Sequence, residues 1–332
     1  MTDGCVPDRV DVKLGFSCNN RCRFCVQGNK RSRYGNLSTA EAMQRIESAR
    51  ARADAVVLTG GEVTIRRDLV RLVAHARSLG FRTIQIQTNG RMLAYEKLCL
   101  ELVQAGATEF SPALHGHRAD LHDYLTQVAG SFDQTLAGIR NLVTLGVPVI
   151  TNTVITRSNF RHLPEIAELL TGLGVTQYQF AFVHALGSAA TNFASIVPRM
   201  ALVSPYVRDG LEVGRLAGVV ARTEAVVACI LPGYEEHMAE WILPDASIFD
   251  ATTVLESYRS YRLTEGKAKG PACDRCGWNA WCEGVWREYV ERYGWSEFEP
   301  VEASEVSSRL RALARRDPTI ASRMESGSVK TG

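Results

Sequence analysis

The sequence has no apolar run that approaches the ~18 residues a membrane-spanning helix requires. Its first residues carry neither the basic nor the apolar segment of a secretory signal peptide. Excess charge is also missing, because 38 Lys and Arg residues nearly balance 36 Asp and Glu residues and leave a net charge of +2. Such a charge gives no reason to expect a nucleic-acid or anionic-membrane partner. These absences predict a cytoplasmic protein that binds neither membranes nor nucleic acids.

The composition is that of an ordinary soluble protein, with 45% hydrophobic and 22% charged residues. A length of 332 residues suits one large domain and a smaller one. The unusual feature is the nine cysteines, most of them clustered at the spacing of metal ligands. This pattern indicates a reducing compartment and metal binding in place of disulfides. Cys99 stands apart within a helical pattern and is expected to be a small buried residue.

Three cysteines follow the first expected strand, residues 9–15. They are Cys18, Cys22 and Cys25, in a Cys-x3-Cys-x2-Cys pattern. Cysteine thiolates are the usual ligands of iron–sulfur clusters, which normally take four. Three thiolates on a four-iron cluster would leave one iron open for a small molecule. The alternatives are scattered buried thiols or a zinc knuckle, and zinc would need a fourth ligand nearby. Residues 26–73 contain no His or Cys that could supply that ligand.

Short β-rich segments alternate with helical patterns from residue 9 to about residue 182. Ser38 and Glu41 form a capping-box pattern before the first long helix, and the apolar run 55–59 is typical of a strand buried on both faces. The expected strands are 9–15, 55–59, 83–88, 109–114, 147–156 and 177–183. Successive strand–helix units demand a parallel sheet with helical crossovers. Six units predict an α/β fold, a partial (β/α)6 TIM-like barrel with its working residues at the C-terminal strand ends.

The cysteine spacing, with Phe24 directly before Cys25, resembles the signature of the radical S-adenosylmethionine (SAM) superfamily. The resemblance implies a 4Fe–4S cluster on Cys18, Cys22 and Cys25 whose open iron chelates the amino and carboxylate groups of SAM. A Gly-Gly-Glu motif after the second strand matches the motif that binds the SAM amino group in that family, although Val63 stands where the family often has Pro. The SAM-binding residues that the resemblance implies are Phe24, Gly60, Gly61, Glu62, Asn89, Ser111 and Asn152. His115, His117 and His122 follow the fourth strand and could contact a substrate.

A second cysteine set lies where the alternation has stopped, and it consists of Cys229, Cys273, Cys276 and Cys282. Four thiolates can hold zinc or an iron–sulfur cluster. Placed after the three-cysteine loop, the set resembles the twitch or SPASM extensions of radical SAM enzymes. That resemblance implies one auxiliary 4Fe–4S cluster that transfers electrons, and structural zinc remains the alternative. The aromatic residues between Trp278 and Trp295 are expected to pack around this centre.

The expected organisation is an N-terminal extension (1–8), a radical SAM partial barrel (9–220), an auxiliary iron–sulfur domain (221–302) and a charged, partly disordered tail (303–332) with one helix to about Arg316. The resemblance implies an enzyme that cleaves SAM to a 5′-deoxyadenosyl radical, which abstracts hydrogen from a substrate C–H bond. A barrel that starts near residue 9 leaves no room for an N-terminal peptide-recognition domain. This favours a small natural product, such as a sugar or nucleoside, over a ribosomal peptide matured by crosslinking or thioether formation. The expected partners are that substrate and a reductant such as flavodoxin or ferredoxin. An electron carrier without turnover is the alternative of another class.

Overall fold

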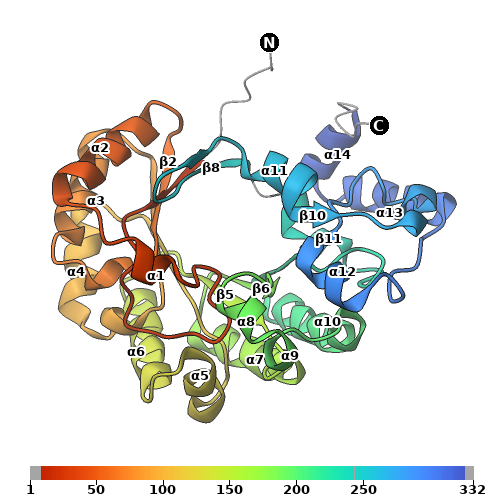
Figure 1. Cartoon of the computed structure of the whole chain (residues 1–332), viewed down its shortest axis with the longest axis horizontal. Coiled ribbons are helices and arrows are strands. Elements are labelled where there is room, and N and C mark those ends of the chain that lie inside the picture. Colours follow the sequence, from red (N-terminus) through yellow and green to blue (C-terminus); the bar gives the residue numbers. More distant parts are fainter. Residues whose placement is uncertain (1–8, 243, 326–332) are drawn as a thin grey trace.

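The computed structural model describes residues 9–242 and 244–325 (Figure 1). The predicted N-terminal extension and the last residues of the predicted tail lie outside this part of the chain. Eight strands run parallel to their neighbours in one curved wall. They are β1 (Arg9–Lys13), β2 (Ala55–Thr59), β3 (Thr83–Thr88), β4 (Glu109–Pro112), β5 (Ile150–Ile155), β6 (Gln177–Phe182), β7 (Val220–Glu224) and β8 (Ala246–Phe249).

The wall is a partial barrel. Its order is β4-β3-β2-β1-β8 in one sheet and β5-β6-β7 in the other. Parallel bridges from Phe110 to Val149 and from Ala113 to Asn152 join β4 to β5. Within the described residues no pairing joins β7 to β8, so the predicted partial TIM-like barrel is confirmed. Two more parallel strands extend it than the six expected, and β8 brings the region after residue 220 back against β1.

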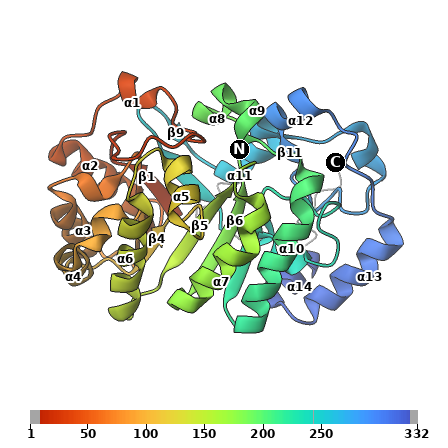
Figure 2. The same cartoon turned by 90° about the horizontal axis from the view of Figure 1, so that it is seen from below.

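Helices cover the outer face of the wall (Figures 1 and 2). The principal ones are α2 (Thr39–Arg50), α3 (Leu69–Ser78), α4 (Glu96–Ala105), α6 (Ser131–Thr144), α7 (Leu163–Leu173) and α10 (Met200–Ala217). The predicted capping box is present, because the Ser38 side chain accepts from the Glu41 N–H and Glu41 accepts from the Ser38 N–H. Shorter helices are α1 (Lys30–Arg33), α5 (Ala119–Thr126), α8 (Ser188–Thr191) and α9 (Phe193–Ile196).

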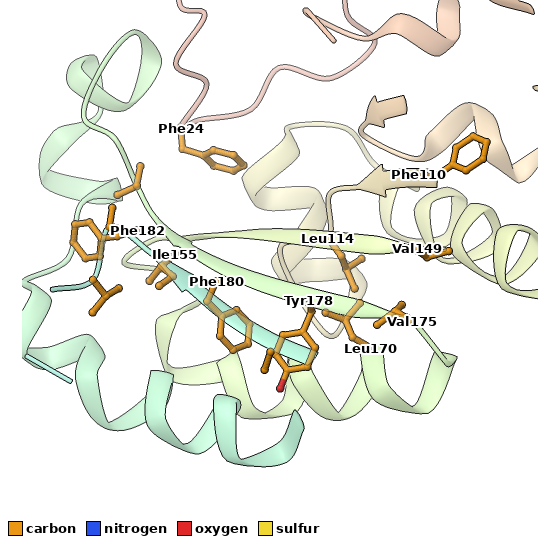
Figure 3. Close-up of a cluster of buried hydrophobic side chains, with 14 of the residues drawn as sticks. Phe24, Phe110, Leu114, Val149, Ile155, Leu170, Val175, Tyr178, Phe180 and Phe182 are labelled. Carbon is orange, nitrogen blue, oxygen red and sulfur yellow. The ribbon is translucent and has the colours of Figure 1, made fainter. Parts of the chain in front are cut away.

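The main core lies between the wall and these helices. Tyr178 and Phe180 of β6 point towards α7 and α10 (Figure 3), and α10 presents glycines to both of them. A Cβ atom at Gly210 would lie 2.7 Å from the Phe180 ring, and one at Gly214 would lie 2.4 Å from the Tyr178 hydroxyl. The two glycines therefore let two fully buried aromatic rings fit under the helix.

The inner face of the wall is more polar. Strand β2 is buried at three successive residues, as its apolar run predicts. Strands β5 and β6 instead alternate buried and half-buried residues, and the half-buried set includes Asn152 and Gln179. Because successive side chains point to opposite faces, the outer face of β6 is aromatic, that of β5 carries two buried threonines and Ile155, and the inner faces of both strands keep polar groups. This barrel interior is therefore built to hold something other than packed side chains.

The C-terminal region packs beside β6, β7 and α10 (Figures 1 and 2). It contains β9 (Val254–Leu255), α11 (Tyr258–Tyr261), β10 (Lys267–Ala268), β11 (Val285–Trp286), α12 (Arg287–Tyr293), α13 (Ala303–Ala314) and α14 (Pro318–Glu325). Helix α13 confirms the helix predicted in the tail, and α14 adds a second one. Among the described residues, no helix combines the length and apolarity needed to cross a bilayer.

Candidate active site

The three-cysteine loop connects β1 to α1 and is held from several sides. The Arg31 guanidinium donates to the carbonyls of Cys18 and Asn20, both at 2.6 Å. The Arg91 guanidinium donates to the carbonyl of Asn19 at 2.5 Å and to the Asn20 side-chain oxygen at 3.0 Å. The Asn20 N–H also lies 3.4 Å from the Cys18 Sγ. Two arginines thus fix the loop backbone that carries the first cysteine.

The three thiols lie close enough together that the charges of their neighbours raise the pKa values of Cys18 and Cys22. Burial, together with the charges of Cys25 and Cys18, raises the pKa of Cys22 to about 12. Burial also raises the pKa of Cys18, and the charges of Glu62 and Cys25 add to the effect. Thiolates that repel one another in a half-buried loop would be stabilised by a positively charged group between them. The donor set therefore fits an iron centre held by thiolates.

Gly60 and Gly61 follow β2 and lie against the start of the cysteine loop. A Cβ atom at Gly60 would meet the Gly15 carbonyl oxygen at 2.3 Å, and one at Gly61 would meet the Phe16 and Ser17 carbonyl oxygens at 2.4 Å. The Gly61 N–H donates to the Gly15 carbonyl at 2.9 Å. Any side chain here would push the cysteine loop away, because backbone atoms cannot give way as a flexible side chain can.

Glu62 is buried, and its carboxylate accepts hydrogen bonds from neighbouring residues. Its Oε1 accepts from the Thr64 N–H at 2.9 Å, from the Thr64 hydroxyl and from the Thr88 hydroxyl at 2.6 Å. Its Oε2 accepts from the Asn89 N–H at 2.6 Å. Three of these donors share Oε1 and one reaches Oε2, so Oε2 keeps an acceptor position for a further donor. Glu62 thus contributes negative charge beside Cys18 and fixes the turn at Asn89.

The other predicted SAM contacts lie on β4 and β5, in the turn after β3 and in the loop itself. The Asn89 amide donates to the Asn19 side chain at 2.6 Å and lies 3.9 Å from the Cys18 Sγ. Ser111 is buried on β4. The Asn152 Oδ1 is buried and has no hydrogen-bond partner among the described residues. An orphaned buried acceptor costs free energy, so a donor from a bound molecule would suit it. Phe24 reaches from the loop towards the strands (Figure 3).

His115 and His122 lie behind the loop, whereas the His117 ring lies against His162. The His115 ring packs edge-on against Phe24 with centroids 4.6 Å apart, and the His122 Nδ1 accepts from the His115 N–H at 3.1 Å. Burial lowers the pKa of His115 well below its ordinary value and that of His122 to about 4. Neither these two nor His117 contributes to the wall of the main cavity. His115 and His122 therefore support the loop.

A cavity of about 700 Å³ opens inside the barrel. Cys22, Phe24, Cys25 and Gly60 form part of its wall, and seven of the eight barrel strands contribute a residue. Asn152 faces the same side of β5 as Val154, which lines the cavity. The structure thus brings two of the three loop cysteines and the glycine turn to one open space. Gly61, Glu62, Asn89 and Ser111 lie outside this wall.

The four C-terminal cysteines meet in a second, smaller cavity. Cys229, Cys273, Cys276 and Cys282 all line it. Burial and the neighbouring thiol charges raise the pKa of Cys229 to about 12. Backbone N–H groups of Gly284 and Val301 point at sulfurs of the set, at 3.3 and 3.4 Å. The cysteines predicted as one ligand set are therefore neighbours in space.

Among the described residues, no group of three or more His, Cys, Asp or Glu side chains is arranged to coordinate a single metal ion.

Aromatic and charged side chains separate the two cavities. The Trp278 ring lines the four-cysteine cavity, as predicted, but Trp286 lines the main cavity instead. Trp286 stacks on His184 with centroids 3.8 Å apart and an interplanar angle of 8°. The Lys267 ammonium lies 5.1 Å from the centre of the Trp286 ring. Trp286 thus forms part of the wall between the main cavity and the buried Lys267.

Several cavity residues carry no sequence signal of their own. The residues that sequence reasoning missed are Lys13, Lys30, His184, Glu224, Asp250 and Tyr258. They come from separate strands and helices, so no local spacing links them. Only the position of Lys13 and Glu224 at the ends of parallel strands could have marked those two.

The fold and these sites define the class of protein. A partial parallel barrel with three clustered cysteines after its first strand and a Gly-Gly-Glu turn after its second is the arrangement of iron–sulfur proteins that bind SAM. In agreement, residues 12–170 match the model of the Radical SAM superfamily. Residues 12–170, which contain the cysteine loop and the Gly-Gly-Glu turn, therefore form a radical SAM domain.

Curated relatives share about half of the chain. The AdoMet-dependent heme synthase of Oleidesulfovibrio alaskensis is 30% identical over 183 residues, which cover 54% of this chain and 47% of the relative. A probable GTP 3′,8-cyclase of Saccharolobus islandicus is 32% identical over 180 residues, which cover 53% and 57%. The chain therefore spans about half the length of the curated relatives it matches.

The fold similarity extends further than the sequence similarity. SuiB of Streptococcus suis, bound to S-adenosylmethionine, matches with a TM-score of 0.63 and 16% identity over 90% of this chain and 77% of that one. SuiB bound to its precursor peptide SuiA gives the same TM-score over 90% of this chain and 75% of that one. The likeness includes most of the C-terminal region as well as the barrel.

Proposed function

We propose that this chain is a radical SAM enzyme that removes a hydrogen atom from a substrate C–H bond and carries one auxiliary cluster. The observation that carries the proposal is the meeting of Cys22, Cys25 and Gly60 on one cavity of about 700 Å³. An electron carrier has no need of a large cavity beside its thiolates. A catalyst needs its reactive centre and its substrate in the same space.

The residues of the first site have distinct tasks. Cys18, Cys22 and Cys25 hold a 4Fe–4S cluster. When bound, the cluster and SAM supply an electron and a 5′-deoxyadenosyl radical for hydrogen abstraction. Gly60 and Gly61 bring backbone close to the SAM amino group. Glu62 adds negative charge there.

The remaining contacts orient SAM. Phe24 offers an apolar surface at the cavity wall. Asn152 offers a buried acceptor without a partner, while Asn89 and Ser111 provide polar groups next to the loop. Together these residues would hold and orient SAM beside the cysteine loop.

The four C-terminal cysteines hold the auxiliary 4Fe–4S cluster in this proposal. Four thiolates leave no iron open for substrate, so the cluster transfers electrons. Residues 221–302 act as the auxiliary region and residues 9–220 as the catalytic barrel, although β8 joins the two through β1. A flavodoxin or ferredoxin supplies the electron that starts each turnover.

The first hypothesis for the substrate is a small molecule of natural-product biosynthesis. The second hypothesis is a ribosomal peptide. The structural similarity to SuiB, which binds a precursor peptide, over 90% of this chain favours it. The cavity is large enough for either a small molecule or one peptide side chain, since ligand pockets commonly measure ~300–1,000 Å³.

The first experiment measures iron, sulfide and zinc after anaerobic reconstitution, and then 5′-deoxyadenosine formed with SAM and dithionite. We expect about eight irons, because two 4Fe–4S clusters are proposed, and formation of 5′-deoxyadenosine. About four irons plus zinc would make the C-terminal set structural. No 5′-deoxyadenosine would favour the electron-carrier reading.

Replacing Cys18, Cys22 and Cys25 together by Ala should abolish SAM cleavage while the C-terminal iron stays. Cys99→Ala is the matched control, because Cys99 is buried and its Sγ donates to the Leu93 carbonyl, away from both cysteine sets. Survival of SAM cleavage in the triple variant would refute the assignment of the loop.

A further inference from the structure

Two lysines share one aspartate on the wall of the main cavity. Lys13 ends β1, Lys30 begins α1 and Asp250 follows β8. The Nζ atoms of Lys13 and Lys30 lie 2.7 and 2.6 Å from the same atom, Oδ2 of Asp250. The Oδ1 of Asp250 accepts from the Ala251 N–H at 2.7 Å. We call these three side chains the lysine cluster.

The lysine cluster carries more positive than negative charge. Although burial alone would raise it, the two ammonium groups lower the pKa of Asp250 to about 2, so Asp250 is ionised at neutral pH. Each ammonium has three donors, and among the described residues each donates one side-chain hydrogen bond, to Asp250. Two cations against one anion leave one net positive charge and unused donors at the cavity.

The other charged residue types on the cavity wall are acidic. Its other Asp, Glu, Lys or Arg residues among the described ones are Glu224 and Glu265. Glu224 ends β7, and its Oε2 accepts from the Gln179 side-chain amide at 2.7 Å. Burial raises the pKa of Glu224, and the charge of Glu240 adds to the effect, so attraction at the lysine cluster, and not repulsion at Glu224, directs an anionic ligand. The cavity is therefore polarised, with one end suited to a negatively charged group.

We propose that Lys13 and Lys30 anchor an acidic group of the substrate, a carboxylate or a phosphate, inside the cavity. This inference rests on the proposed function, because the cavity is the one in which the C–H bond would be attacked. Cys25 lies on the same wall as both lysines, so the anchored group fixes the substrate close to the cysteine loop. Asp250 holds the two ammonium groups together and competes with the ligand for them.

Anion binding to the anaerobically reconstituted protein tests the proposal. The SAM site is first filled with S-adenosylhomocysteine, so that the probe cannot occupy the place of the cofactor's own carboxylate. Pyrophosphate and glutarate are then titrated separately by calorimetry. Stronger binding of pyrophosphate identifies a phosphate-bearing substrate, and stronger binding of glutarate a carboxylate.

Two variants should shift the affinity in opposite directions, and a third is a control that should leave it unchanged. Lys30→Gln should weaken binding of the preferred probe by about tenfold, since a charge-assisted hydrogen bond is lost. Asp250→Asn should strengthen it, because the competing negative charge is gone. Lys97→Gln is the control, since the Lys97 side chain is 87% exposed and lies 3.8 Å from the Glu101 carboxylate on the surface.

A purely structural ion pair predicts a different result. Lys30→Gln and Asp250→Asn would then lower the melting temperature and leave anion affinity unchanged, which overturns the proposal. Failure of both probes to bind the wild-type protein overturns it as well, as does binding that occurs only when S-adenosylhomocysteine is left out. The proposed function stands or falls separately, on whether the wild-type protein forms 5′-deoxyadenosine.

Discussion

Lys267 of β10 lies at the centre of a buried ion network with Glu240 and Glu283, and replacing it should destabilise the protein. Its side chain is 1% exposed. The Nζ lies 2.9 Å from a carboxylate oxygen of Glu240 and 2.9 Å from one of Glu283. Arg262 donates to both oxygens of Glu283 at 2.7 and 2.9 Å. In Lys267→Met, Glu283 keeps a cationic partner, whereas the Glu240 carboxylate loses its bond to Lys267.

The expected loss of stability comes from the Glu240 carboxylate, which the substitution leaves without its cation. Removing one partner of a buried ion pair costs about 3–5 kcal/mol because an uncompensated charge remains. At about 2.1 cal/mol/K per residue, a chain of 332 residues unfolds with an entropy of roughly 0.7 kcal/mol/K, so the loss corresponds to a melting temperature lower by roughly 4–7 °C. The double variant Lys267→Met with Glu240→Gln should recover much of the loss, because the stranded charge is removed with its partner.

Differential scanning fluorimetry of the reconstituted protein measures the effect, with Lys97→Met as the exposed control. Burial alone would lower the pKa of Lys267, but Glu240 and Glu283 raise it above the ordinary value of 10.5. A raised folded-state pKa means that the stabilisation is complete below pH 10.5 and is lost as the pH rises through the folded value. The difference between variant and wild type should therefore not change near neutral pH. A Lys267→Met protein that melts with the wild type would refute the reasoning.

Three further predictions concern the cysteine loop and the lysine cluster. Gly61→Ala should reduce the iron bound at the cysteine loop by half or more, because the new Cβ atom would meet the Ser17 carbonyl oxygen at 2.4 Å. Gly35→Ala is the control and should leave the iron content unchanged, because a Cβ atom there would have no neighbour within 4 Å. Asn152→Ala should weaken SAM binding by about tenfold in equilibrium dialysis, since it removes a buried acceptor; unchanged binding would exclude Asn152 as a contact. Acid titration should lower the free energy of unfolding by about 1 kcal/mol, a figure reduced for solvent screening. The loss should occur as the pH falls from the ordinary Asp pKa of 3.8 to about 2, the pKa of Asp250 in the folded protein. Asp250→Asn should lack that step.

The local features of the chain could be read from the sequence because they depend on neighbouring residues. The capping box at Ser38 and the burial of Cys99 were predicted and are present. The predicted C-terminal ligand set shares one cavity, although Cys229 lies far in sequence from the other three. Composition and spacing were enough here, because clustered thiols have few other uses in one chain.

Two strands were missed for a physical reason. Strand β8 has four residues, and its partner β1 lies at the other end of the chain. A strand's pattern shows which of its faces is buried, but not which distant strand it pairs with. The same limit hid the lysine cluster, whose members come from β1, α1 and the segment after β8.

The sequence by itself determined the class of chemistry, because three closely spaced cysteines after a strand and a Gly-Gly-Glu turn after the next are local patterns. Only the tertiary structure decided that Glu62 accepts hydrogen bonds from Thr64, Thr88 and Asn89 and that Trp286 faces the main cavity. It also decided that one aspartate neutralises only one of two lysines there. Charge balance in a cavity depends on side chains that folding brings together from distant segments, and no spacing along the chain records it.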